Sequence, residues 1–113
     1  MGAISFDKDA GWVRANWVFD LLMDDLLVIV DDEKLKYEIE KAKALNGLHL
    51  HLKDKQTAKI LLEELIRLAS RIIAGEITPA LKIKGLESDD VEKYKNSLKE
   101  LVDLMKQYEH QFN

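Results

Sequence analysis

The segment VEKYKNSLKELVDLMKQYEHQF, residues 91–112, carries apolar side chains at alternating intervals of three and four. This spacing brings one apolar side chain per turn to the same face of a helix, and it is typical of helices that pack lengthwise against other helices. The preceding segment 88–90, SDD, provides a cap and two acids that favour a helix N-terminus. We therefore predict a helix from residue 88 to the end of the chain. The apolar positions, called here the 91–112 seam, are Val91, Tyr94, Leu98, Leu101, Met105, Tyr108 and Phe112.

A first helix is predicted over residues 9–30, which are apolar on most sides of the helical cylinder. Asp20 and Asp24, one turn apart, belong to its narrow polar stripe. A helix of this kind is buried on most sides, or divides its surface between the core and an interface. A chain of 113 residues has few places to bury such a helix. We therefore expect the chain to associate with itself.

Two further helices are predicted between these segments, over residues 32–45 and 55–74. Gly47 follows the first and Gly75 the second. Glycine readily takes the left-handed conformation with which many helices end. Pro79 then prevents the second helix from resuming.

Two short segments alternate apolar and polar residues with the period of a strand, namely 48–52 (LHLHL) and 81–84 (LKIK). Two such strands alone form only a marginal sheet. We interpret them as extended connectors that can pair, one on each side of the helix 55–74. Continuation of the helix 32–45 into residue 52 is the alternative. The predicted fold is all-α, an up-and-down bundle of four helices in one domain, residues 1–113.

The composition bounds the class of protein. Apolar residues make up 47% of the chain, there is one proline, and the net charge of −4 disfavours nucleic acid and anionic lipid as partners. The chain contains no cysteine and its first residues do not resemble a secretory leader. The longest apolar stretch, 17–30, is interrupted by three aspartates, which are costly inside a membrane. We expect a soluble, cytoplasmic protein.

No catalytic residue and no cofactor site is predicted, because the chain shows no nucleophile–base spacing and no glycine-rich phosphate loop. His49 and His51 lie two apart, so on a strand they would project from the same face as a pair of metal ligands. Together with Asp20 and Asp24 they define the alternative to a purely binding function, a metal-binding protein or small hydrolase. A solvent-facing histidine pair is favoured over this alternative.

The surplus of apolar helix surface and the absence of site chemistry favour a function in protein–protein contact. We predict a small regulator, adaptor, immunity or inhibitor protein that acts as a homodimer, with itself or another protein as partner. A nucleic-acid regulator that uses the basic residues of 82–84 and of the helix 55–74 is disfavoured by the acidic net charge. The predicted interface residues are Trp12, Trp17, Val91, Tyr94, Leu98, Leu101, Met105 and Tyr108.

Overall fold

A small β-sheet contradicts the predicted all-α bundle. The computed structural model describes residues 1–112 and contains a three-stranded mixed sheet with the strand order β2-β1-β3. Strand β1 (Gly2–Ser5) pairs antiparallel with β2 (Gly11–Arg14) and parallel with β3 (Gly47–His49). The fold is therefore α+β, and the prediction of a four-helix up-and-down bundle is wrong.

Strand β2 falls inside the segment that we predicted as the beginning of the first helix. Its side chains alternate in burial, since Trp12 is 1% exposed and Val13 is 48% exposed. A short apolar run fits a helix and a strand equally well, and here the pairing with β1 favours the strand. The helix α1 therefore begins at Asn16 and not at residue 9.

The other three predicted helices begin and end close to their predicted bounds, but the structure also contains a helix where the sequence predicted an extended segment. The predicted helices 32–45 and 55–74 are confirmed as α2 and α3, and the helix predicted from residue 88 is confirmed as α5 followed by η2, with Asn113 outside the described residues. The segment 48–52 is extended only in β3 and then forms the 3-10 helix η1. Within residues 1–112, no helix is long and apolar enough to cross a membrane. The helices are α1 (Asn16–Ile29), α2 (Glu33–Leu45), η1 (Leu50–Leu52), α3 (Lys55–Ile73), α4 (Pro79–Lys84), α5 (Ser88–Tyr108) and η2 (Glu109–Phe112).

The segment 81–84, which we predicted as extended, belongs to the helix α4, so this prediction is wrong. The hydroxyl of Thr78 caps this helix by accepting a hydrogen bond from the Leu81 amide at 3.2 Å. Pro79 occupies the first turn, where its fixed φ suits a helix and its missing amide hydrogen costs nothing. Gly85 ends the helix at a φ of 62°. An alternation over four residues is too short a signal to outweigh these local start and stop signals.

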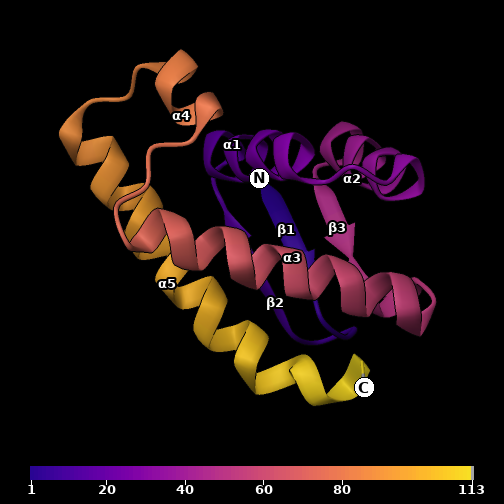
Figure 1. The fold of residues 1–113 in the computed structure, drawn as a ribbon. Coiled ribbons are helices and arrows are strands. Elements are labelled where there is room, and N and C mark those ends of the chain that lie inside the picture. Colours follow the sequence, from indigo (N-terminus) through magenta and orange to yellow (C-terminus); the bar gives the residue numbers. More distant parts are fainter. Residues whose placement is uncertain (113) are drawn as a thin grey trace.

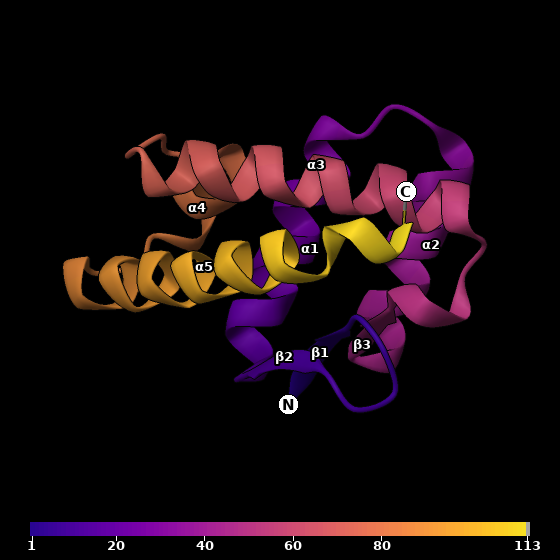
Figure 2. The same ribbon diagram turned by 90° about the horizontal axis from the view of Figure 1, so that it is seen from below.

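The helices cover one face of the sheet. The buried side chains Ile4, Trp12 and Leu48, one from each strand, point into the core on that face. Figure 1 shows α3 in front of the strands, and Figure 2 shows α3 and α5 side by side on one side of the sheet, running in opposite directions. The opposite face is open to solvent, where His49 is exposed. This arrangement is common for sheets that contain antiparallel pairs.

Helix α5 uses the 91–112 seam to pack into the core of its own chain. The indole Nε1 of Trp12 donates a hydrogen bond to the backbone oxygen of Ser97 at 2.9 Å, which attaches β2 to α5. An ion pair between Arg14 and Glu100 joins the same two elements. The seam residues with no exposed surface are Tyr94, Leu98, Leu101 and Met105.

Candidate functional site

Most of the predicted interface residues lie inside the core of a single chain. Trp17 and Val91 are partly exposed, and so is Tyr108, whose ring stacks on that of Phe6 with the centroids 5.5 Å apart. The side chains that are at most 1% exposed offer no surface to a partner while the chain stays folded. These buried residues are Trp12, Tyr94, Leu98, Leu101 and Met105.

The four residues of the metal-binding alternative do not form a ligand cluster. Asp24 on α1 pairs with Lys43 on α2, with its Oδ1 at 2.6 Å from the lysine Nζ. His49 shares a hydrogen bond of 3.1 Å with the Ser5 hydroxyl on the open face of the sheet, and the rings of His49 and His51 meet edge to face at 6.2 Å. Among residues 1–112, no three His, Asp or Glu side chains are grouped as metal ligands would be.

A groove between α1 and α4 is the candidate functional site. Its volume is about 510 Å³, within the roughly 300–1,000 Å³ typical of binding sites. Figure 1 shows the short helix α4 beside one end of α1, connected by loops on both sides. Helix α1 contributes Leu21, Asp24 and Val28, and helix α4 contributes Pro79, Ala80, Ile83 and Lys84.

An exposed aliphatic side chain lies on each wall of this groove. Ile83 is 87% exposed, and Val28 on the opposite wall is 55% exposed. Ile77, just before the cap of α4, is 74% exposed. Single exposed apolar side chains are common, but two of them on opposite walls of one hollow are typical of a surface that contacts another molecule.

The groove carries one acid and one base among its lining residues. The Asp24 carboxylate on α1 is 42% exposed and its hydrogen bond raises the pKa of Lys43. Lys84 lies on the α4 side of the groove. Among residues 1–112, no ion pair includes Lys84 or its neighbour Lys82. The rim therefore presents charges of both signs.

A buried carboxylate holds α4 next to this groove. Asp25 is 1% exposed, and it accepts hydrogen bonds from the Thr78 hydroxyl at 2.5 Å and from the Tyr94 hydroxyl at 3.0 Å. It thus links α1 to the cap of α4 and to α5. Burial raises the pKa of Asp25, although both hydrogen bonds oppose this shift, and the nearby Asp24 adds to it. Burial and the Asp25 carboxylate also raise the pKa of Tyr94, whose hydroxyl therefore remains a donor at neutral pH.

Replacement of Asp25 by Asn should change how stability depends on pH. The pKa of Asp25 is raised in the folded state, so as pH rises the unfolded chain releases the carboxyl proton before the folded chain does. Between about pH 4 and the raised pKa, the folded state binds more protons than the unfolded state. The free energy of unfolding of the wild type therefore falls as pH rises through this range. The loss amounts to about 1.4 kcal/mol for each unit by which the pKa is raised. The asparagine variant has no such proton, so wild type should lose stability relative to it over this window.

Urea unfolding of both proteins from about pH 4 to 7 measures the difference, with Asp24→Asn as the control for loss of a more exposed charge. Parallel pH curves for wild type and Asp25→Asn would contradict the assignment.

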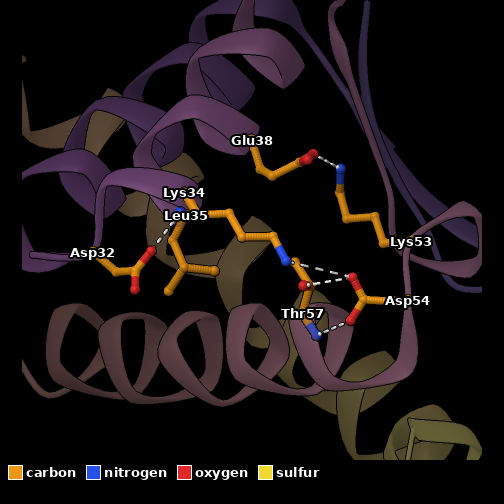
Figure 3. A network of polar contacts seen from close by, with 7 residues as sticks. All are labelled: Asp32, Lys34, Leu35, Glu38, Lys53, Asp54 and Thr57. Carbon is orange, nitrogen blue, oxygen red and sulfur yellow. Dashed lines mark hydrogen bonds and ion pairs between the residues drawn. The ribbon is translucent and has the colours of Figure 1, made fainter.

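A second polar network connects α2 to the beginning of α3 (Figure 3). Asp54 caps α3 by accepting a hydrogen bond from the Thr57 amide at 2.9 Å, and this bond is the largest cause of its lowered pKa. Lys53 forms an ion pair with Glu38 on α2, and both side chains are mostly buried. The Nζ of Lys34 lies 3.9 Å from the Oδ2 of Asp54. Every carboxylate here has a partner within the network or a helix amide, so we interpret these contacts as structural.

The sequence did not indicate Asp25 as the buried acid, since Asp20 and Asp24 form the more obvious pair. Its position relative to Leu22 and Val18, three and seven residues before it, is the signal that could have revealed it. Both are buried, and this spacing places all three residues on the inward face of α1. Thr78, as a cap before a proline, was likewise recognisable, but its contact with Asp25 depends on the tertiary fold.

Comparison of the chain with protein-family models, with curated proteins and with solved structures gave no significant match. Two features of the α1–α4 groove bear on function. Ile83 and Val28 are exposed on its opposite walls, and Asp24 and Lys84 place charges of opposite sign among its lining residues.

Proposed function

We propose that this chain acts by binding a protein in the groove between α1 and α4, as a small regulator, adaptor, immunity or inhibitor protein. One observation carries the proposal, namely the exposure of Ile83 and Val28 on the two walls of an apolar groove. Burial of exposed aliphatic surface favours association by about 25 cal/mol for each Å² removed from water. The lack of cysteine agrees with a reducing compartment, and we propose a cytoplasmic location.

A protein fits this surface better than a small molecule does. A small ligand in the groove would contact its walls, but it would leave the outer side of Ile83, at 87% exposure, in water. A helix or a folded surface laid across the groove would cover Ile83 and fill the hollow together. Interfaces between proteins combine an apolar centre with a polar rim, and the rim here is supplied by Asp24 and Lys84.

Replacement of Ile83 by Asp should abolish partner binding without unfolding the chain. The side chain is almost fully exposed, so its replacement costs little folding free energy, whereas a carboxylate in an apolar interface centre is left without its water. We expect affinity to fall by at least about 100-fold, equal to about 2.7 kcal/mol. The matched control is Leu52→Asp, the same kind of substitution at a side chain that is 74% exposed and lies on η1.

The measurement is native mass spectrometry of the wild type and both variants after gentle purification from the protein's own host. We expect a protein complex for the wild type and for Leu52→Asp, and a bare chain for Ile83→Asp. Far-UV circular dichroism checks that all three proteins are folded. A wild-type chain that carries only a small-molecule mass, or a complex that survives Ile83→Asp unchanged, would contradict the proposal.

A further inference from the structure

We infer that the partner in the α1–α4 groove is a second copy of this chain, placed by a two-fold axis. This inference rests on the proposed function and names its partner. In a two-fold dimer the same surface patch is used twice, so each residue that protrudes must meet a hollow of the other copy. The groove satisfies this requirement, because a protruding Ile83 and a hollow lined by Leu21 and Val28 belong to one patch.

The shape of the patch supports reciprocal insertion. Ile83 and Val28 lie on opposite walls, so rotation of a copy can bring Ile83 of one chain over the α1 wall of the other. The contact is then made twice, once in each direction.

In the same orientation, the charges on the patch of one copy are complementary to the charges on the patch of the other. Lys84 follows Ile83 on α4, and Asp24 lies one helical turn from Val28 on α1. An orientation that sets Ile83 over Val28 of the second copy therefore brings Lys84 towards its Asp24. Within residues 1–112 the contact of Asp24 with Lys43 uses only Oδ1, and no ion pair involves Lys84. A partner with only acidic or only basic side chains would match one of the two rim charges and oppose the other.

Exchange of the two charges between copies provides the test. Lys84→Glu alone and Asp24→Lys alone should each weaken the dimer about tenfold or more, because each places like charges together at both symmetric contacts. An equimolar mixture of the two variants should form a heterodimer with an affinity within about threefold of wild type, since every contact again joins opposite charges. Sedimentation equilibrium on the purified protein measures the dimer against the 13.0 kDa mass of one chain.

A mixture of Asp24→Lys with Lys59→Glu is the matched control. Lys59 is exposed on α3, outside the groove, so Lys59→Glu should dimerise with itself as the wild type does. It should not form a heterodimer with Asp24→Lys as tightly as Lys84→Glu does, because one of the two contacts would still join like charges. Circular dichroism confirms folding of each variant, as expected because the ion pair lost with Asp24 is about 40% exposed on both sides and contributes little.

The outcomes separate the inference from the proposed function. A wild-type chain that is monomeric at all concentrations overturns the inference, while a complex with another protein from the host still supports the function. A dimer that neither reversal weakens, or a mixture that fails to restore it, also overturns the inference. A tight heterodimer of Asp24→Lys with Lys84→Glu, and a weaker heterodimer of Asp24→Lys with Lys59→Glu, supports it.

Discussion

Leu98→Asp should leave this chain unfolded at room temperature. Leu98 lies in the middle of α5 with no exposed surface, facing the apolar core. The substitution removes about 2–3 kcal/mol of apolar burial and places a carboxylate in the apolar core, at a cost on the order of 5 kcal/mol more. A domain of this size has about 5–15 kcal/mol of stability in total. Circular dichroism at 222 nm should therefore show no cooperative urea transition.

The control for this substitution is again Leu52→Asp, which we expect to unfold like the wild type because Leu52 is 74% exposed. The comparison also tests the role of the 91–112 seam. If the seam were an interface between chains, Leu98→Asp would yield a folded monomer. A cooperative transition close to that of the wild type would show that Leu98 is not part of the core.

Trp12→Ala should lower the free energy of unfolding by about 3–5 kcal/mol. The indole is 1% exposed, fills the space between β2 and α5, and donates its hydrogen bond to the Ser97 backbone oxygen at 2.9 Å. The Arg14 guanidinium lies 5.5 Å from the centre of the ring, so the substitution also removes this cation–π contact. A cavity in the core adds to the lost contacts, because the surrounding structure relaxes only in part.

Trp17→Ala is the matched control, since it removes the same side chain from a partly exposed position at the beginning of α1. We expect it to cost less than half as much as Trp12→Ala. Urea unfolding followed by circular dichroism gives both values on the same scale. Equal losses for the two tryptophans would contradict the packing of β2 against α5.

The sequence predicted those helices that depend on local signals. The 91–112 seam, the cap Asp54 and the end of α2 all depend on residues within one or two turns of the chain. At the end of α2 the left-handed residue is Asn46, with a φ of 54°, and not the predicted Gly47, which belongs to β3. Consequently α2, α3 and α5 begin and end near their predicted bounds. A helix bound needs no knowledge of distant residues when the chain itself supplies the cap, as Asp54 does for α3. The cap predicted in the segment 88–90 is wrong, because the N-cap of α5 is Glu87 and no side chain caps this helix.

The sheet could not be predicted in the same way, because a strand of four residues is stable only through its partners. Strand β2 is a strand because β1 pairs with it, and β3 joins from a segment more than 30 residues further along the chain. The same reason explains why the segment 81–84 was assigned wrongly. Its alternation had no strand to pair with, and the cap of Thr78 made it a helix.

The candidate site likewise combines features that follow from local sequence with features that depend on tertiary contacts. The sequence by itself determined that the helical segments each carry an apolar face, and where α2, α3 and α5 begin and end to within a few residues. Only the tertiary structure decided which apolar face is buried in the core, namely the seam of α5. It also decided which apolar side chains stay exposed, among them Val28 and Ile83 in the groove. It also decided that Asp25, and not its neighbours Asp20 and Asp24, is the buried acid. The physical reason is that burial depends on contacts between distant elements, whereas periodicity records only that a face is apolar.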